Sequence, residues 1–234
     1  MEINEFVEEL KKLGINITDK QLEQLETYYN LLIETNKITN LTRITNKQEV
    51  YLKHFYDSLT LIKAYDLTKD LTLCDLGSGA GFPGIVLKIV FPNLNITLVD
   101  SLNKRTIFLK QVIKELNLKD INVVTSRIED YSKNNIESFD ILTSRAVAKT
   151  NILLELSSQL LKVNGYFLIM KANIEEELKE SKNAINKLNY KLIDKIEFNL
   201  PKENSKRTIL KLKKIDKTDK KYPRDFAKIK KNPL

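Results

Sequence analysis

Four of the six glycines in this chain lie within eight positions, in the stretch CDLGSGAGFPGI at residues 74–85. They are Gly77, Gly79, Gly81 and Gly84. Glycine costs backbone entropy inside regular structure, so a chain that uses it sparingly needs backbone freedom at this point. We expect a short strand before the glycines and a helix after them. Such a strand, turn and helix N-terminus form a site where a ligand lies against main-chain N–H groups.

Two kinds of ligand use this architecture, a dinucleotide and S-adenosylmethionine. The spacing of Gly79, Gly81 and Gly84 fits the dinucleotide pattern G-x-G-x-x-G, so the glycines alone leave a nicotinamide cofactor open. Asp75, two residues before the first glycine, favours the sulfonium donor. A carboxylate there would repel a pyrophosphate, but it suits the ammonium group of a methionine moiety.

Carboxylates also follow the next two expected strands. Asp100 ends the second strand, where it can accept hydrogen bonds from both ribose hydroxyls. After the third strand, a main-chain N–H of Arg127-Ile128-Glu129 and the Glu129 carboxylate can meet the N1 and N6 edge of adenine. Phe82 lies in the glycine loop, where it either covers the cofactor or packs on the sheet. We therefore expect S-adenosylmethionine as the cofactor.

The methyl acceptor is inferred by elimination. Amine methylation is associated with an Asn/Asp-Pro-Pro-aromatic turn, whereas the chain has Thr143-Ser144-Arg145-Ala146 after its fourth strand. Carbon methylation of a pyrimidine needs a nucleophilic cysteine, and Cys74 is expected inside a strand. Oxygen acceptors commonly use a Lys or His base; His54, the only histidine, is expected on a helix, as a ligand contact or a packing residue. Guanine N7 needs no deprotonation, and Arg145 would bind the guanine or steady the cofactor. No catalytic base is assigned.

Composition narrows the class of protein. The chain has 234 residues, 42% of them apolar and 30% charged, and no apolar run approaches the ~18 residues of a membrane span. One cysteine and one histidine exclude an internal disulfide and a zinc site. We expect a cytoplasmic, metal-independent protein that does not enter membranes.

Positive charge is concentrated at the C-terminal end. Residues 211–234 carry ten Lys/Arg against three Asp, whereas residues 1–34 carry eight acids and three bases. A basic tail indicates a polyanion partner, most simply nucleic acid; the alternative is a solvated lysine-rich tail. Three other functions stay open: a nicotinamide oxidoreductase, a non-catalytic RNA-binding protein and a methyltransferase for small molecules.

The first 68 residues are expected to form a helical extension. Apolar residues at helical spacing predict a helix from Ile3 to Leu10 that ends at Gly14. Capping boxes at Thr18 and Asn46 predict two more helices. The polar stretch 36–45 between these two helices is expected to be a loop.

From residue 69 to 215 strands and helices alternate, which predicts a mostly parallel, Rossmann-like sheet covered by helices on both faces. A C-terminal antiparallel hairpin is expected to close one edge, followed by a basic tail at 216–234 that either packs on the domain or extends from it. The expected strands are 71–76, 95–100, 121–126, 139–144 and 165–171, the hairpin strands are 190–199 and 207–214, and the helices are 84–90, 103–116, 151–162 and 174–188.

From about Asn36 onward, the chain resembles the ribosomal RNA small-subunit methyltransferase G family, also called glucose-inhibited division protein B. Its most specific motifs are DLGSGAGFPG (75–84) and SRAVA (144–148), in this order and spacing. The supporting motifs are NLT (40–42), His54 with Asp57-Ser58-Leu59, Lys104-Arg105 with Phe108-Leu109, Arg127-Ile128-Glu129, Tyr222-Pro-Arg224 and Pro233-Leu234.

The resemblance implies a class I methyltransferase fold and a bacterial enzyme that methylates N7 of one guanine in 16S rRNA, near the decoding site. It also implies that the methyl donor contacts Gly77, Phe82, Ile128, Glu129 and Arg145. We expect the guanine to enter past Arg145 and Lys171, with Arg224 as a further substrate contact, and the protein to be a monomer. The chain departs from the family pattern at Thr35, Ala172, Ala227 and Ile229, where the family has Trp, Gly, Gly and Pro.

Overall fold

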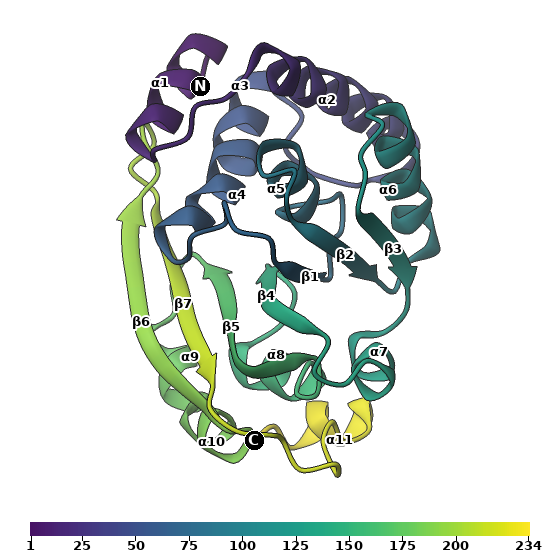
Figure 1. Cartoon of the computed structure of the whole chain (residues 1–234), viewed down its shortest axis with the longest axis vertical. Coiled ribbons are helices and arrows are strands. Elements are labelled where there is room, and N and C mark those ends of the chain that lie inside the picture. Colours follow the sequence, from purple (N-terminus) through teal and green to yellow (C-terminus); the bar gives the residue numbers. More distant parts are fainter.

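A computed structural model describes all 234 residues. At its centre is one seven-stranded sheet with the strand order β3-β2-β1-β4-β5-β7-β6 (Figure 1). The first five strands pair in parallel, and β7 pairs antiparallel with both β5 and β6. This confirms the expected α/β fold with its C-terminal hairpin. The strands are β1 (Thr72–Leu76), β2 (Asn95–Asp100), β3 (Ile121–Thr125), β4 (Phe139–Arg145), β5 (Leu161–Lys171), β6 (Tyr190–Asn199) and β7 (Lys206–Lys214).

The register of the parallel strands brings their carboxyl ends to one edge of the sheet. Leu76 of β1 lies opposite Val99 of β2, and Asp100 of β2 lies opposite Thr125 of β3. On the other side of β1, Asp75 lies opposite Thr143 of β4. The loops that follow these strands therefore meet, as ligand sites do in open α/β sheets.

Helices cover both faces of the sheet (Figure 1). The N-terminal helices lie on the same face as α5 and α6, and the later helices lie on the opposite face. The first face carries α1 (Ile3–Lys12), α2 (Asp19–Thr39), α3 (Lys47–Val50), the π-helical turn η1 (Tyr51–Tyr56), α4 (Asp57–Leu59), the 3-10 turn η2 (Thr60–Lys63), α5 (Gly84–Val90) and α6 (Asn103–Glu115). The second face carries α7 (Ile128–Asn134), α8 (Thr150–Leu156), α9 (Glu175–Glu180), α10 (Lys182–Lys187) and α11 (Phe226–Lys231).

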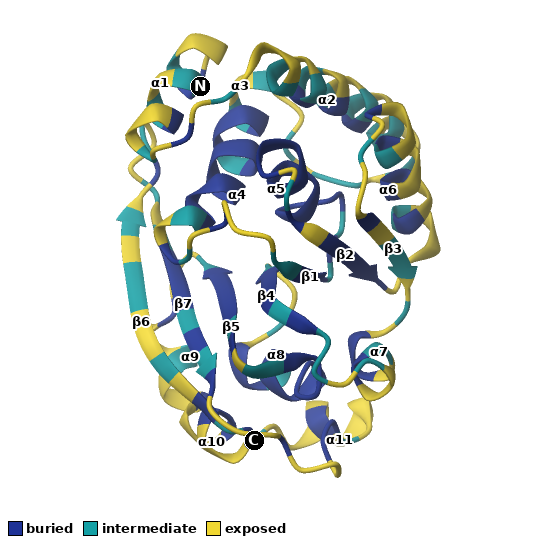
Figure 2. Cartoon of the chain, viewed as in Figure 1, coloured by how far each residue is buried: buried dark blue, intermediate teal, exposed yellow.

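Each face has its own hydrophobic core, and the central strands β1, β2 and β4 between the two cores are mostly buried (Figure 2). The first core joins Phe6 and Leu25 of the N-terminal helices to Leu98 of the sheet. The N-terminal helices and the sheet thus bury apolar surface together, which is the main driving force for folding. The domain limits drawn at residues 68 and 215 stay a prediction.

Several local expectations can be compared with the structure. The capping box at Thr18 is confirmed, because its hydroxyl accepts from the Gln21 N–H and the Gln21 side chain accepts from the Thr18 N–H. The expected loop 36–45 is wrong in its first part: α2 continues to Thr39 and ends at Asn40, whose φ of 49° asparagine tolerates. The helix expected at 151–162 ends at Leu156, and β5 already begins at Leu161.

Two short helices were not expected, α7 directly after β3 and α11 in the basic tail. The tail is therefore packed structure for part of its length. None of the helices combines the length and apolar character needed to cross a membrane.

Candidate active site

The glycine loop between β1 and α5 has the left-handed backbone that its sequence suggested. Gly77 has φ of +68°, and a Cβ at this position would lie only 2.4 Å from Cγ2 of Val147. Val147 belongs to the loop after β4, so two strand-end loops touch here across bare main chain. Gly77 is thus required both by its backbone angle and by this close approach.

Asp100 fixes the loop from the end of β2. Its Oδ2 accepts from the Gly79 N–H at 2.9 Å, and its Oδ1 accepts from the Leu102 N–H at 2.9 Å. The Arg105 guanidinium donates to the same carboxylate at 3.3 Å. Asp100 is only 3% exposed, so these charge-assisted bonds hold both the carboxylate and the turn in place.

Asp75 lies beneath the loop. It is fully buried, its Oδ2 accepts from the Gly84 N–H at 3.0 Å, and its Oδ1 has no hydrogen-bond partner. Burial, which disfavours the charged form, raises the pKa of this carboxyl to about 7. Asp75 is not among the residues that line the cavity above the loop. Its position supports the turn, and the expected contact with a donor ammonium group stays a prediction.

A cavity of about 440 Å³ lies at the carboxyl ends of β1, β2, β3 and β4. We call it the strand-end cavity. It brings together Gly77, Asp100, Ile128 and Glu129, four of the six residues expected to bind the methyl donor. Its volume suits a small organic ligand. Its other lining residues are Val99, Ser101, Arg105, Ser126, Arg127, Ala146, Val147, Ala148, Leu156 and Phe226.

The chemical groups that line the strand-end cavity also suit S-adenosylmethionine. Gly77 contributes bare main chain to the cavity wall, where an added Cβ would collide with Val147, another lining residue. The Asp100 carboxylate lies at the end of β2, and the Glu129 carboxylate, 6% exposed, lies in the first turn of α7 after β3. These are the positions at which the sequence placed ribose and adenine contacts.

Phe82 packs below the loop. Its side chain is 6% exposed and does not line the strand-end cavity. The ring stacks on His54 with centroids 4.3 Å apart, and the Arg145 guanidinium lies 5.1 Å from its centroid. Tyr28 of α2 lies on the ring as well, with centroids 5.5 Å apart. The ring therefore packs against α2 and η1, and its contact with the cofactor stays a prediction.

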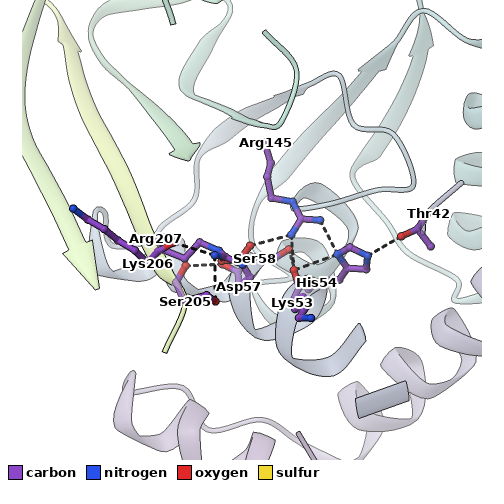
Figure 3. A network of polar contacts seen from close by, with 10 residues as sticks. Thr42, Lys53, His54, Asp57, Ser58, Arg145, Ser205, Lys206 and Arg207 are labelled. Carbon is purple, nitrogen blue, oxygen red and sulfur yellow. Dashed lines mark hydrogen bonds and ion pairs between the residues drawn. The ribbon is translucent and has the colours of Figure 1, made fainter. Parts of the chain in front are cut away.

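The other two expected donor residues, Phe82 and Arg145, contact each other at a second site. Figure 3 shows the polar contacts of Arg145 there. The Arg145 guanidinium donates to Asp57 Oδ2 at 3.1 Å and to the Lys53 carbonyl at 2.9 Å. Asp57 Oδ1 accepts from Arg207 Nε at 3.1 Å. Asp57 is 4% exposed, so one buried carboxylate orients two arginines from different strands. We call His54, Asp57, Arg145 and Arg207 the charged cluster.

His54 is the neutral member of the charged cluster. Its Nδ1 lies 3.1 Å from the Arg145 guanidinium and its Nε2 lies 3.0 Å from the Thr42 hydroxyl (Figure 3). Nδ1 also lies 3.2 Å from the carbonyl oxygen of Lys53. Burial, together with the positive charge of Arg145, lowers the pKa of His54 to about 3. At neutral pH the imidazole is uncharged, and both of its nitrogens are engaged.

The charged cluster borders a second cavity of about 340 Å³, which we call the cluster cavity. Ala146, directly after Arg145, lines both cavities, so the two sites share a wall. The other lining residues of the cluster cavity are Ile44, Lys53, His54, Asp57, Arg145, Met170, Lys171, Ala172 and Arg207.

Lys171 reaches the cluster cavity as expected, but its ammonium group is engaged. It donates to the Ala148 carbonyl at 2.6 Å and pairs with Glu177 at 2.7 Å. Its side chain is 13% exposed and held by both contacts, so it forms a fixed positive wall rather than a flexible arm.

Arg224 lies apart from both Arg145 and Lys171. Its Nε and an Nη donate to the two oxygens of Glu155 at 2.6 and 2.7 Å, and the Glu155 side chain is fully buried in α8. The guanidinium also donates to the Asn232 carbonyl at 3.1 Å. This bidentate pair fixes the tail to α8, and Arg224 lines neither cavity. The expected contact of Arg224 with the substrate stays a prediction.

Sequence reasoning missed functions for three residues that the structure brings to these sites. Asp57 follows His54 by three residues on a helix, a spacing that could have indicated a shared face. Arg207 had no local signal, because it meets Asp57 from a distant hairpin strand. Phe226 is an aromatic residue within a run of lysines, and its place in the strand-end cavity depends on α11.

Comparisons with known proteins agree with this geometry. A family model for rRNA small subunit methyltransferase G matches residues 21–207. The Ribosomal RNA small subunit methyltransferase G of Staphylococcus saprophyticus is 46% identical, with 100% of this chain and 99% of that protein covered. That of Lactobacillus helveticus is 47% identical over the full length of both chains, and that of Bacillus subtilis is 46% identical over 100% of this chain and 99% of its own.

Solved structures share the fold at low sequence identity. M. jannaschii TYW2 in complex with AdoMet has a TM-score of 0.58 at 18% identity and covers 74% of this chain and 80% of its own. A SAM-dependent methyltransferase from Aquifex aeolicus has a TM-score of 0.57 at 17% identity, with coverages of 77% and 98%. The motifs, the full-length similarity and the match over most of the chain agree: the protein belongs to the rRNA small subunit methyltransferase G family.

Proposed function

We propose that this protein transfers the methyl group of S-adenosylmethionine, held in the strand-end cavity, to N7 of a guanine of 16S rRNA, held in the cluster cavity. Its family makes it an S-adenosylmethionine-dependent rRNA methyltransferase. The target atom and the role of each residue are the proposal. The observation that carries it is the shared wall at Ala146, which sets a donor-sized cavity directly beside a cluster of cations.

In this proposal, groups that line the strand-end cavity hold the donor. The methionine part would lie along the main chain of Gly77, and the ribose hydroxyls would donate to Asp100. The adenine would lie between Ile128 and Glu129, whose carboxylate can accept from the exocyclic amine. The donor supplies an electrophilic methyl group on a sulfonium centre. The protein positions the two reactants and keeps water out, which is the main requirement of an in-line displacement.

The state of two side chains favours an acceptor that needs no base. His54 is neutral but has both nitrogens engaged, so it is not free to remove a proton. Cys74 is fully buried in β1, and burial raises the pKa of its thiol well above the usual value. A thiolate nucleophile for carbon methylation is therefore absent. Guanine N7 has its own lone pair in the ring plane and loses no proton when it is methylated.

The charged cluster can bind guanine without blocking N7. Arginine and lysine are the preferred donors to the O6 and N7 edge of guanine. Arg145 and Arg207 are oriented by Asp57, and Lys171 lies on the same cavity wall. We propose that one of these cations donates to O6 while N7 faces the shared wall. The others contact neighbouring phosphates.

The charges in the site suit this transfer. Positive charge leaves the sulfonium centre and appears on the methylated purine, so no negative charge develops that would require a cation. The Asp57 carboxylate between Arg145 and Arg207 offsets one of the two positive charges next to the product. The remaining positive charge of the cluster repels the positively charged methylated base, and this repulsion aids product release.

The basic tail extends the RNA surface in this proposal. Lys220, Lys230 and Lys231 are exposed and form no ion pair within 4.0 Å, so they are free to meet phosphates. We propose that the protein acts as a monomer in the cytoplasm, without a metal ion, on 16S rRNA or the small ribosomal subunit.

The direct test is the chemistry of the product. Small subunits and protein-free 16S rRNA that lack the modification are incubated with methyl-labelled donor, and the nucleosides are separated by mass spectrometry. We expect label in N7-methylguanosine alone. Label at another atom would contradict the N7 assignment, and label only in small molecules would contradict the RNA acceptor. Asp100→Ala, which removes the carboxylate that holds the loop but keeps the cations, should bind RNA without turnover.

A further inference from the structure

We propose that Phe226, in the C-terminal helix α11, is a donor-binding residue whose ring packs on the adenine of S-adenosylmethionine. The inference rests on the donor placement proposed above and adds a residue from the basic tail to that site. Among the large hydrophobic side chains that the structure leaves exposed, Phe226 is the one aromatic residue, with an exposure of 38%. It borders the strand-end cavity. When a flat ligand covers an exposed ring at a cavity wall, the apolar surface of the ring is buried, and this burial favours binding.

The neighbours of Phe226 place it at the adenine part of the cavity. The Arg127 guanidinium lies 5.6 Å from the centroid of the ring, and Arg127 directly precedes Ile128 and Glu129. All four residues line the same cavity. Glu129 and Ile128 would read the edge of the base, but they leave its face to be covered. An aromatic ring beside an arginine is a common way to hold the face of a nucleobase.

The tail holds Phe226 in a fixed position. Ile229, one turn further along α11, is fully buried in the second core, where Tyr222 is also buried. Between them in sequence, Arg224 makes its bidentate pair with the buried carboxylate of Glu155. The helix is therefore docked on α8 through both apolar and charged contacts. A ring that is ordered before the ligand arrives loses little entropy on binding.

The first test uses the absence of tryptophan from the chain. Phe226→Trp introduces a single indole at the proposed contact, and Phe198→Trp, in strand β6 and outside the strand-end cavity, is the matched control. We expect titration with S-adenosylhomocysteine to change the fluorescence of Phe226→Trp along the binding curve measured by calorimetry, and to leave that of Phe198→Trp unchanged. Binding by calorimetry without a fluorescence change at position 226 would overturn the proposal.

The second test measures affinity in otherwise wild-type protein. Phe226→Ala should weaken the binding of S-adenosylmethionine by about ten-fold, the usual effect of losing one base-stacking ring. Phe226→Tyr keeps the ring and should bind nearly as the wild type does. Adenosine should show the same dependence, since it retains the base without the methionine part. Thermal unfolding of each variant reports whether α11 stays docked.

The outcomes separate this inference from the donor placement. If Phe226→Ala binds normally while Glu129→Ala is weakened, the donor lies as proposed and Phe226 is not part of its site. If neither substitution changes the affinity, the donor placement itself fails. If Phe226→Ala loses affinity for S-adenosylmethionine but not for adenosine, the ring does not pack on the base and the inference is wrong.

Discussion

The strand-end cavity and the charged cluster lie side by side, but the chain builds them in different ways. The first is made of main chain and strand ends: a glycine turn, and carboxylates held by N–H groups within a few residues of each strand. The second is made of side chains from three distant parts of the chain, namely η1 and α4, the end of β4 and the start of β7.

This difference indicates a division of tasks. A site of main chain and left-handed glycines suits one ligand that is the same in every turnover, because its shape is set by backbone geometry. A site of arginines around one buried carboxylate suits a specific acceptor, because each guanidinium reads a pattern of acceptors. Phe82 joins the two: it comes from the glycine loop and stacks on His54 and Arg145.

A substitution in the glycine loop should remove donor binding and leave the charged cluster intact. Gly77→Val should abolish measurable donor binding, because a Cβ there collides with Val147 and φ of +68° disfavours any side chain. The matched control is Gly14→Ala, at φ of +76° with no atom within 4 Å of the added Cβ. This control should lose about 1–2 kcal/mol of folding free energy and no donor affinity. Calorimetry and thermal unfolding of both variants separate strain from function. Equal donor affinity in the two variants would contradict the account.

A substitution in the charged cluster should slow methylation and leave donor binding intact. Asp57→Asn keeps the shape of the side chain but removes the charge that orients Arg145 and Arg207. We expect methylation to slow by about a hundred-fold, the typical result of misplacing a reactant slightly. Donor affinity should stay at the wild-type value. A donor affinity that falls together with the rate would mean that the two regions are not separate sites.

The lysines of α11 should affect RNA binding and leave donor binding unchanged. Changing Lys228, Lys230 and Lys231 to Gln removes three exposed charges from the helix that carries Phe226. Affinity for rRNA should weaken and become less dependent on salt, with the logarithmic slope falling by about 0.7–0.9 for each phosphate that these lysines neutralise in the wild type. Donor affinity should be unchanged. An unchanged salt slope would place the RNA surface elsewhere.

The pH dependence of folding stability should differ between the two regions, because each contains one buried titratable side chain, Asp75 or His54. The pKa of Asp75 is raised from 3.8 to about 7, so the folded state binds more protons than the unfolded state between these values and its stability falls as pH rises. The pKa of His54 is lowered from 6.5 to about 3, so its contribution to stability falls as pH drops below 6.5. We expect Asp75→Asn to gain a few degrees in melting temperature over wild type at pH 8, and less at pH 5. His54→Gln should show the opposite trend, with its relative gain at pH 5. Parallel pH profiles for all three proteins would contradict these shifts.

The comparison also explains what the sequence could predict. The glycine loop and its flanking elements are local, so β2 and α5 occur at the expected residues and four donor residues meet in one cavity. The charged cluster depends on Asp57 meeting Arg207 across 150 positions, which no local pattern encodes. Family resemblance supplied His54, Asp57 and Arg145, but not the ion pairs that join Asp57 to Arg145 and Arg207.

The tail shows the same limit. Its lysines predicted a charged surface, whereas α11 is ordered by contacts of Ile229 and Arg224 with α8. Arg224 was expected as a substrate contact, and its guanidinium is paired with Glu155. Its partner Glu155 lies on a helix that sequence periodicity placed without showing which side chains would be buried.

We propose above that the donor lies on bare main chain at the end of β1, beside the charged cluster. A crystal structure of the complex with S-adenosylhomocysteine would show where the donor binds. The account predicts the ligand in the strand-end cavity, with ribose at Asp100, adenine at Glu129 and the sulfur facing Ala146. Density in another pocket, or a ligand whose sulfur faces away from Arg145, would contradict it.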